Sequence, residues 1–429
     1  MATNLQGSSN RPRAVGFRLR NRKDYIYEYN DSKEWREITL RDELKLLQQA
    51  MDKAVESNEV AGATLLILED GREKYYAQSG FADVQGNKLM ERDTIHHLYS
   101  MSKPITAAAV MLLVQDGIVD LCENVGKYLP SFNNQKYVKD GQILDLPEDK
   151  PMRILDLMNM TSGLVYPGLN TEAELETGRL FEAMDVGIRS DRTISTLEFA
   201  DRLGRCPLQF IPGTHFQYGT SADILGALIE VVTGVSFGEF LKERLFDPLK
   251  MKDTGFFVPA EKKSRLSKVY QTGPDGVYES PTNHLAIRYD GNKNLFESGG
   301  AGLFSTIDDY ANFARMLMNG GTFGSECILK ESAVKYLTSG KLMPFQQEDL
   351  YNWAGLEGFT YGNLMRVMEE PGRATLIGNK GEYGWDGWLG TYFANDPSTK
   401  MTVLMMTQMI DTGTGNLVRK LRNIVMNTK

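Results

Sequence analysis

Apolar residues recur along the first part of this chain in patterns that predict one helix and two strands. Residues 44–55 carry apolar side chains at helical spacing. Residues 62–68 and 74–78 have the pattern of strands, and the dipeptide Asp70-Gly71 between them is typical of a tight hairpin turn. We therefore expect a helix followed by a β-hairpin.

The next apolar run predicts a buried helix. Residues 102–115 are largely apolar, and Pro104 suits the first turn of a helix. Between about residues 120 and 285, loop signals alternate with helical stretches, among them 222–232 and 237–246, and few segments alternate as strands do. The middle of the chain is therefore expected to be rich in helices.

Strand patterns return near the C-terminus. Two strand-like runs cover 390–394 and 402–407, and an amphipathic helix is predicted near 417–426. Strands at both ends around a helical middle predict an α/β (α+β) fold with a discontinuous sheet domain. The expected parts are a polar N-terminal arm at 1–40, an α/β domain made of 41–100 and 286–429, and a helix-rich domain at 101–285.

Composition and charge narrow the class of protein. Of 429 residues, 41% are hydrophobic and 24% are charged, which is typical of a globular protein with a sizeable core. The chain has 48 basic and 56 acidic residues and a net charge of −8, so it lacks the cationic excess that nucleic-acid binding needs. We expect a small-molecule substrate and no nucleic-acid partner, and the oligomeric state stays open.

The cysteines and the apolar runs bear on where the protein resides. Cys122, Cys206 and Cys327 are odd in number and far apart, which favours neither a disulfide framework nor a CxxC site. No stretch approaches the roughly 20 apolar residues that span a bilayer, and the N-terminus has no apolar signal core. These features predict a soluble, cytoplasmic protein without a membrane partner.

Two motifs that suggest chemistry are better explained by structure. Ser236 lies in a GxSxG match at 234–238, but an apolar helical run precedes it where a nucleophile elbow requires a strand. We therefore expect Ser236 to cap the helix that begins at Phe237. The adjacent pair His96-His97 has no HExxH or related spacing, so neither a metal site nor a metal cofactor is predicted.

The strongest chemical signal is Ser100-Met101-Ser102-Lys103, an SxxK motif where a loop enters the buried helix. At this spacing the serine and the lysine lie on one helical face, and apolar surroundings can lower the pKa of the lysine from its usual value of about 10.4. A second SxxK, from Ser332 to Lys335, lies among charged residues that offer no such setting. Ser100 is therefore the predicted nucleophile and Lys103 its base.

Two further elements follow this motif along the chain. Tyr218 stands just before an apolar helical run, and a tyrosine near a lysine can act as a phenolate base or a proton shuttle. Trp385-Asp386-Gly387-Trp388 precedes a strand-like run, and a glycine-bearing edge strand can bring a backbone N–H close to a substrate carbonyl.

The order SxxK, YxT and WxG resembles the serine β-lactamase and penicillin-recognising family. Within that family the chain is similar to the class C β-lactamase-like branch, specifically to family VIII carboxylesterases, over roughly residues 40–425. The phrases that carry the resemblance are MTSGL at 160–164, FDPLKM at 246–251, GGAGLFST at 299–306 and GEYGWDGWLGTYF at 381–393.

The resemblance implies a fold and a set of roles. It implies a central antiparallel sheet flanked by helices, with an inserted helix-rich domain. It also implies that Ser100 is acylated, that Lys103 and Tyr218 transfer its proton, and that the backbone N–H groups of Ser100 and Trp388 form the oxyanion hole.

The chain also departs from the family pattern. β-Lactamases usually carry KTG where this chain has Trp385-Asp386-Gly387, and YxN where it has Tyr218-Gly219-Thr220. It therefore lacks the cation and the amide that recognise a β-lactam. The aromatic residues suggest a pocket for an uncharged or apolar group. The residues expected to contact the substrate are Trp385, Gly387, Thr220 and Tyr383.

These observations predict a serine hydrolase that cleaves carboxylic esters through an acyl-enzyme, without a metal or an organic cofactor. The alternatives within the same family are a D-stereospecific peptidase or amidase, a β-lactamase and an acyltransferase. A binding protein on an inactive hydrolase scaffold is a further alternative. The presence of Ser100, Lys103 and Tyr218 together argues against it.

Overall fold

The computed structural model describes residues 34–190, 192–274 and 276–427. The chain divides into two units between Asp42 and Glu43, and the description below concerns Glu43–Lys429. Helix α1 (Glu34–Glu56) begins before the predicted helix at 44–55, so the last residues of the expected arm at 1–40 are helical. The rest of that arm, residues 1–33, lies outside the described residues.

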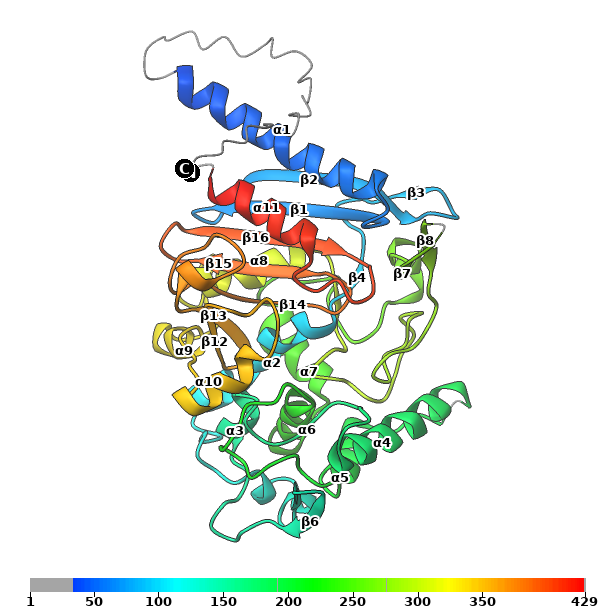
Figure 1. Ribbon diagram of the computed structural model, residues 1–429, viewed down its shortest axis with the longest axis vertical. Helices are drawn as coiled ribbons and strands as arrows, with labels where there is room; N and C mark the ends of the chain where they lie inside the picture. Colours follow the sequence, from blue (N-terminus) through cyan, green and yellow to red (C-terminus); the bar gives the residue numbers. More distant parts are fainter. Residues whose placement is uncertain (1–33, 191, 275, 428–429) are drawn as a thin grey trace, which may run out of the picture. The chain divides into compact units, whose positions relative to one another are not determined.

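The centre of the fold is an eight-stranded sheet in which all neighbouring strands are antiparallel. In spatial order its strands are β12 (Phe359–Gly362), β13 (Met365–Met368), β14 (Tyr383–Asp386), β15 (Tyr392–Asp396), β16 (Met401–Thr407), β1 (Gly62–Glu69), β2 (Arg72–Asp83) and β3 (Lys88–Leu89). The N-terminal hairpin therefore lies beside the last strand of the chain (Figure 1). This arrangement confirms the expected central antiparallel sheet.

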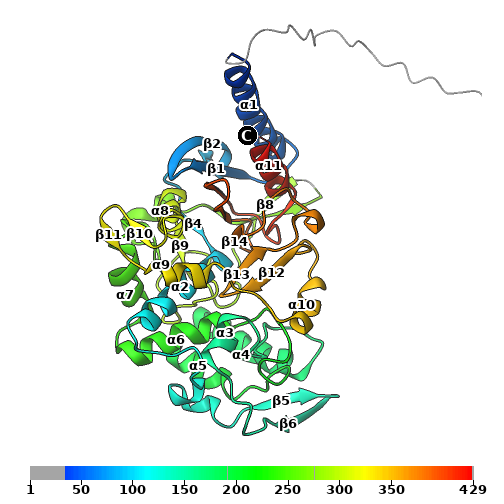
Figure 2. The ribbon, with the colours of Figure 1, turned by 90° about the vertical axis from the view of Figure 1, so that its left-hand side faces the viewer.

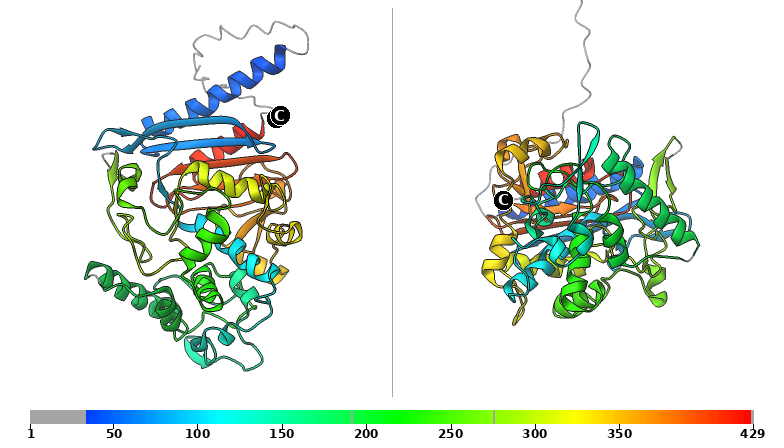
Figure 3. Two further views of the ribbon diagram at one scale, coloured as in Figure 1. Left: turned by 180° about the vertical axis from the view of Figure 1, so that it is seen from behind. Right: turned by 90° about the horizontal axis from the view of Figure 1, so that it is seen from below.

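Successive residues of the central strands point into two different cores. Leu65 of β1 belongs to a core that includes Leu47 of α1 and the apolar face of α11 (Asn416–Met426). Leu66 belongs to another core, together with α2 (Ser102–Gln115) and α8 (Ile307–Met318). Because side chains alternate along a strand, α11 and α8 lie on opposite faces of the sheet, as the front and back views show (Figure 1, Figure 3).

Shorter helices and strand pairs complete the fold. Figure 2 shows the helices from α3 (Ile154–Met158) to α6 (Ser221–Thr233) close together, with the hairpin of β5 (Lys136–Lys139) and β6 (Gln142–Asp145) beyond them. The remaining helices are α3 (Ile154–Met158), α4 (Glu172–Arg189), α5 (Thr196–Leu203), α6 (Ser221–Thr233), α7 (Phe237–Leu241), α9 (Glu331–Leu337) and α10 (Pro344–Tyr351). The small strand pairs are β4 (His96–His97) with β9 (Phe304–Ser305), β5 (Lys136–Lys139) with β6 (Gln142–Asp145), β7 (Tyr270–Gly273) with β8 (Gly276–Glu279), and β10 (Thr322–Phe323) with β11 (Glu326–Cys327).

The predicted and observed elements agree best where the apolar pattern is long. Helix α2 covers the predicted residues 102–115, and all but its last two residues are buried. Strands β12, β13 and β14 were not predicted because each has only four residues, too few to show a clear alternation. The expected division into domains at 41–100 with 286–429 and at 101–285 stays a prediction.

Two observations bear on the surroundings of the protein. Among the described residues no single helix is long and apolar enough to span a membrane, while the pair Ser221–Thr233 and Phe237–Phe246, bent by 83°, meets that requirement together by length and composition. The cysteines are free, with Cys122 and Cys327 exposed and Cys206 partly buried.

Ser236 has the capping role that the sequence predicts. Its hydroxyl accepts a hydrogen bond from the backbone N–H of Glu239 at 3.2 Å, and the carboxylate of Glu239 accepts one from the N–H of Ser236 at 3.1 Å. This reciprocal pair is a capping box at the start of α7. Ser236 therefore stabilises a helix end and does not lie on a nucleophile elbow.

Removing this cap should cost stability. We expect Ser236→Ala to lower the free energy of unfolding by about 1 kcal/mol, because the N–H of Glu239 in the first turn loses its acceptor. Ser332→Ala is the matched control, since Ser332 is an exposed residue inside α9 whose cap is Lys330. Urea unfolding of both variants followed by circular dichroism measures the difference, and equal midpoints would contradict the capping role.

Candidate active site

Ser100 lies where a short 3-10 turn runs into the buried helix. The turn η1 (Tyr99–Met101) ends directly before α2. Tyr99 has a φ of 45°, in the left-handed region that residues other than glycine rarely adopt. Tyr99 and Met101 are buried, whereas Ser100 is partly exposed. The strained turn therefore presents one hydroxyl at the surface of an otherwise packed segment.

Contacts from distant parts of the chain hold this turn in place. The hydroxyl of Thr391 donates to the carbonyl oxygen of Leu98 at 3.0 Å, and the hydroxyl of Tyr310 donates to that of Met101 at 2.9 Å. The backbone of Gly387 comes closer still, because a Cβ atom there would lie 2.3 Å from the carbonyl oxygen of Leu98. A glycine is therefore required at this position of the WxG motif.

Lys103 is fully buried, and its amine contacts three oxygen atoms. Its Nζ lies 3.1 Å from the Oγ of Ser100, 3.0 Å from the hydroxyl of Tyr166 and 2.8 Å from the carbonyl oxygen of Gly300. Burial lowers the pKa of Lys103 to about 7, and nearby carboxylates oppose this shift. A large fraction of Lys103 is therefore neutral at physiological pH.

A neutral Lys103 can satisfy all of these contacts at once. The carbonyl oxygen of Gly300 only accepts hydrogen bonds, so it takes one N–H. The hydroxyl oxygen of Tyr166 can take the second N–H, and the lone pair of the amine is then left for the hydroxyl hydrogen of Ser100. The arrangement suits transfer of a proton from Ser100 to Lys103.

Asp223 lies behind the lysine, in the first turn of α6. Its Oδ1 accepts hydrogen bonds from the hydroxyl of Ser298 and, at 3.0 Å, from the N–H of Gly300. Burial raises the pKa of Asp223, and these hydrogen bonds act against that rise. Because the carbonyl of Gly300 contacts Lys103, the carboxylate positions a direct partner of the lysine and opposes the fall of the lysine pKa.

Tyr218 also lies close to the amine of Lys103. The Nζ of Lys103 lies 4.6 Å from the centroid of its ring, and its hydroxyl oxygen accepts a hydrogen bond from the indole N–H of Trp385 at 2.9 Å. Burial raises the pKa of Tyr218 well above its usual value, although hydrogen bonding to Ser100 and Trp385 opposes the rise. The expected phenolate is therefore disfavoured, and Tyr218 is a protonated phenol that can donate.

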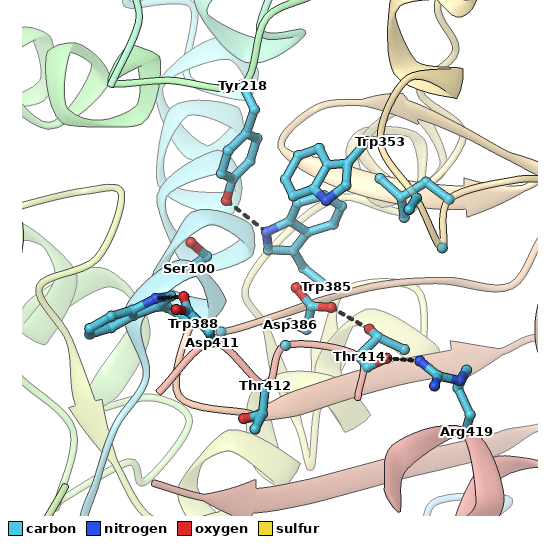
Figure 4. Close-up of a pocket in the computed structure, with 15 residues that line it drawn as sticks. Ser100, Tyr218, Trp353, Trp385, Asp386, Trp388, Asp411, Thr412, Thr414 and Arg419 are labelled. Atoms are coloured by element: carbon cyan, nitrogen blue, oxygen red, sulfur yellow. Dashed lines mark hydrogen bonds between the residues drawn. The ribbon is translucent and has the colours of Figure 1, made fainter. Parts of the chain in front are cut away.

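Two cavities meet at this group of residues. One has a volume of about 420 Å³ and is bordered by Trp353, Trp385 and the segment 411–414 (Figure 4). The other has a volume of about 510 Å³ and is bordered by α4 and the segment 283–285. Ser100, Tyr218 and Trp388 line both. A substrate can therefore extend to either side of the serine, with its reacting bond at the junction.

The backbone N–H groups expected to form an oxyanion hole lie at this junction. Within the described residues, the N–H groups of Ser100 and Trp388 donate to no protein acceptor. The run at 390–394, expected to be a glycine-bearing edge strand, overlaps β15, which lies between β14 and β16 and is not an edge strand. Strand β13 pairs with β14 only at Tyr383 and Gly384, so the chain from Trp385 onward has no strand beside it on that side.

Two of the residues expected to contact the substrate do not line either cavity. Tyr383 is buried two residues deeper in β14 than Trp385, about 7 Å further along the strand, and its hydroxyl accepts from Asn395 at 3.0 Å. The hydroxyl of Thr220 is buried and donates to the carbonyl oxygen of Val165 at 3.3 Å. Both side chains therefore support the site from within the protein, whereas Trp385 and Gly387 line the 420 Å³ cavity.

The other motifs lie apart from the cavities. His96 and His97 are buried in β4, where burial lowers their pKa values to about 3 and about 4. In the part of the chain that the structure describes, no group of three or more His, Cys, Asp and Glu residues could hold a metal ion. Ser332 and Lys335 are exposed on α9, away from both cavities.

Three residues of the site were not predicted. Tyr166 follows the phrase MTSGL by two residues, and only the structure shows that it reaches Lys103. Asp223 had a usable signal, because a carboxylate inside an apolar helical run needs a buried partner. Trp353 follows α10, and the centroid of its ring lies 4.8 Å from that of Tyr218. Nothing in the sequence around Trp353 indicates this contact.

The chain is similar to known proteins over most of its length. A family model described as Beta-lactamase matches residues 47–419. Esterase EstB from Burkholderia gladioli is 27% identical over 399 residues, which cover 88% of this chain and 94% of EstB.

Two solved structures resemble the chain over most of its length. EstCE1, described as a hydrolase with promiscuous acyltransferase activity, has a TM-score of 0.75 at 22% identity and covers 90% of this chain and 99% of its own. A family VIII carboxylesterase has a TM-score of 0.66 at 18% identity and covers 90% of this chain and 98% of its own. At such identities the two structures support the fold, which is the β-lactamase/transpeptidase-like one. Since the family model spans most of the sequence, this chain belongs to the β-lactamase family.

Proposed function

We propose that the protein is a serine hydrolase that cleaves carboxylic esters through an acyl-enzyme on Ser100. The observation that carries this proposal is the distance of 3.1 Å between the Nζ of Lys103 and the Oγ of Ser100, at a fully buried lysine. The tryptophan at the first position of WxG and the esterases among the similar proteins favour an ester over a β-lactam.

In acylation, the Oγ of Ser100 bonds to the carbonyl carbon while its proton passes to the neutral amine of Lys103. The carbonyl oxygen becomes negative, and the N–H groups of Ser100 and Trp388 stabilise it. The carbonyl then re-forms, the bond to the alcohol oxygen breaks, and the alcohol takes a proton from Tyr218. The proton on Lys103 restores the phenol, and the acyl group remains on Ser100.

In deacylation, water takes the place of the alcohol. Lys103 accepts a proton from water as its oxygen bonds to the acyl carbon, and the Oγ of Ser100 leaves and regains a proton. The protonated state of Tyr218 suits this relay, because its oxygen accepts from Trp385 and its own hydrogen remains free to donate. Lys103 is thus the base and Tyr218 the acid.

The alternatives differ in the acceptor or in the leaving group. If an alcohol replaced water as the acceptor, the same residues would catalyse acyl transfer. EstCE1 is a hydrolase with promiscuous acyltransferase activity. A D-stereospecific peptidase or amidase would release an amine, and a β-lactamase would open a cyclic amide. We further propose a reducing, cytoplasmic location, which the three free cysteines support.

The nucleophile is tested by substitution. We expect Ser100→Ala to lower kcat/KM for a short-chain 4-nitrophenyl ester at least about a thousandfold, because no other group can form the acyl-enzyme. Ser236→Ala and Ser332→Ala should keep the activity of the wild type. A fluorophosphonate probe should label the wild type and not Ser100→Ala, and undiminished turnover in Ser100→Ala would refute the assignment.

The base is tested by the pH dependence of kcat/KM. Lys103 must be neutral to accept the proton, so the rate should rise with pH and reach half of its maximum near the lysine pKa of about 7. Removing the negative charge with Asp223→Asn makes the ammonium less favourable, so the midpoint should move to lower pH. A midpoint that does not move, or that moves to higher pH, would exclude this coupling.

The substrate preference is tested with a β-lactam. Trp385 stands where β-lactamases have a lysine, and a charge-assisted hydrogen bond contributes about 1.5 to 3 kcal/mol, so nitrocefin should turn over at least about tenfold more slowly than 4-nitrophenyl acetate. Hydrolysis of both is measured on one preparation by absorbance. If nitrocefin matches the ester, the preference for esters is wrong.

A further inference from the structure

The cavity of about 420 Å³ beside Trp353 carries negative charges, which the family pattern does not lead one to expect. Among the described residues its lining includes Asp386, Asp411 and Arg419. The family usually has a lysine and a threonine where this chain has Trp385 and Asp386. One cation is therefore replaced by an aromatic ring, and an anion is gained one residue later.

The carboxylate of Asp386 has one engaged and one open oxygen. Its Oδ2 accepts a hydrogen bond from the hydroxyl of Thr414 and lies 3.7 Å from the Nη1 of the buried Arg366. In the described part of the chain, Oδ1 has no hydrogen-bond donor. The side chain is 21% exposed, and Figure 4 shows it between Trp385 and Thr414 at the edge of the cavity. The fixed Oδ2 orients the carboxylate, and Oδ1 is available to a ligand.

This carboxylate lies close enough to act on the catalytic pair. Burial lowers the pKa of Lys103, and the negative charge of Asp386 is one of the causes that oppose this fall. The same charge adds to the effect of burial in raising the pKa of Tyr218. Asp386 and Ser100 also line the same cavity, so a substrate group bound at Asp386 shares that cavity with the reacting serine.

The surrounding surface is aromatic as well as acidic. Trp353 is 38% exposed, and Trp388 and Tyr218 are partly exposed along the same cavity. The faces of such rings carry negative potential and attract cations, most strongly those with a diffuse charge. Asp411 adds a second carboxylate, which accepts from the indole N–H of Trp388. Carboxylates and aromatic faces together favour a cationic ligand.

Arg419 does not cancel this preference near the serine. Its Nη1 donates to the carbonyl oxygen of Thr414 at 2.9 Å, and the hydroxyl of Thr414 donates to Asp386. Thr414 therefore stands between the guanidinium and the carboxylate, and Figure 4 shows Arg419 at the end of the cavity formed by α11.

On the basis of the ester hydrolase function proposed above, we propose that this cavity binds an alkylammonium group of the substrate, with Asp386 as its anionic partner and Trp353 as an aromatic wall. The substrate class is thus an ester whose acyl or alcohol part carries a positive charge a few atoms from the reacting carbonyl. The family-wide motif residues alone do not imply this preference, because it arises from Asp386.

Binding is measured first, because it does not depend on hydrolysis. Choline and 3,3-dimethylbutan-1-ol have nearly the same shape and differ in charge. The binding of each is measured by the change in fluorescence of the tryptophans that line the cavity. At low ionic strength the full-length wild type should bind choline at least about tenfold more tightly than the alcohol. This ratio should fall close to one in Asp386→Asn and persist in Asp386→Glu. It should also persist in Asp140→Asn, a matched loss of one charge at an exposed residue of the loop between β5 and β6.

Hydrolysis then shows which part of the ester occupies the cavity. Acetylcholine is compared with 3,3-dimethylbutyl acetate for the alcohol part. The 4-nitrophenyl esters of 4-(trimethylammonio)butanoate, 5,5-dimethylhexanoate and glutarate are compared for the acyl part. In either the alcohol series or the acyl series, kcat/KM should be about tenfold higher for the cationic ester than for its neutral analogue, because KM is lower. This ratio should shrink when salt is added. Both substrates of a pair are assayed on the same sample, so a partly unfolded variant does not distort the ratio.

The outcomes separate this proposal from the proposed function. Equal binding of choline and its neutral analogue by the wild type, or faster hydrolysis of the glutarate ester than of the cationic one, would overturn the cation site and leave the esterase standing. Choline binding that depends on Asp386, without hydrolysis of any ester, would support the cation site and remove the esterase function. A charge preference that survives in Asp386→Asn would overturn the role of Asp386.

Discussion

The site depends on one physical constraint, the burial of a lysine amine in an apolar helix. Helix α2 is buried along nearly its whole length, so Lys103 loses the water that would stabilise its ammonium form. The cost of that loss is limited because the amine meets three oxygens at hydrogen-bond distance. Each of these oxygens comes from a different segment, and the positions of those segments are therefore tied to the chemistry of one nitrogen.

The sheet brings those segments together from distant parts of the sequence. Strand β1 precedes Ser100 and pairs with β16, and β15 and β14 follow in the sheet. The turn after β14 thereby lies against the turn before α2, where Gly387 approaches Leu98 and Thr391 bonds to it. The two backbone N–H groups proposed for the oxyanion hole thus come from opposite ends of the chain. Their relative position is set by antiparallel pairing and by a glycine without a Cβ atom.

Sequence patterns predicted the parts of this arrangement that are local. Helix α2 and the serine and lysine one turn apart follow from spacing and apolarity alone, and the cap at Ser236 follows from the helix before it. Contacts made across the fold were not predictable in this way. Tyr166 reaches Lys103 from a loop, and the side chains of Tyr383 and Thr220 are buried in hydrogen bonds within the protein. The sequence did not indicate these positions, because neither the depth of a residue in a strand nor the direction of a loop produces a periodic pattern. The resemblance to a family supplied Tyr218 and Trp388, which spacing alone did not distinguish from ordinary core residues.

The electrostatic balance at Lys103 also connects catalysis with the choice of substrate. Burial alone favours the neutral amine, while Asp223 on one side and Asp386 on the other favour the ammonium, and a pKa of about 7 is the result. Asp223 is held by Ser298 and Gly300 inside the protein, so its contribution is constant. Asp386 lines the cavity, so its contribution would change if a charged ligand bound there. A cation bound there would offset the carboxylate and lower the pKa of Lys103 further, which would leave more of the amine neutral when the cavity is filled. A substrate of the proposed class would therefore raise the fraction of the base in its active form, whereas a neutral ester would leave the balance unchanged.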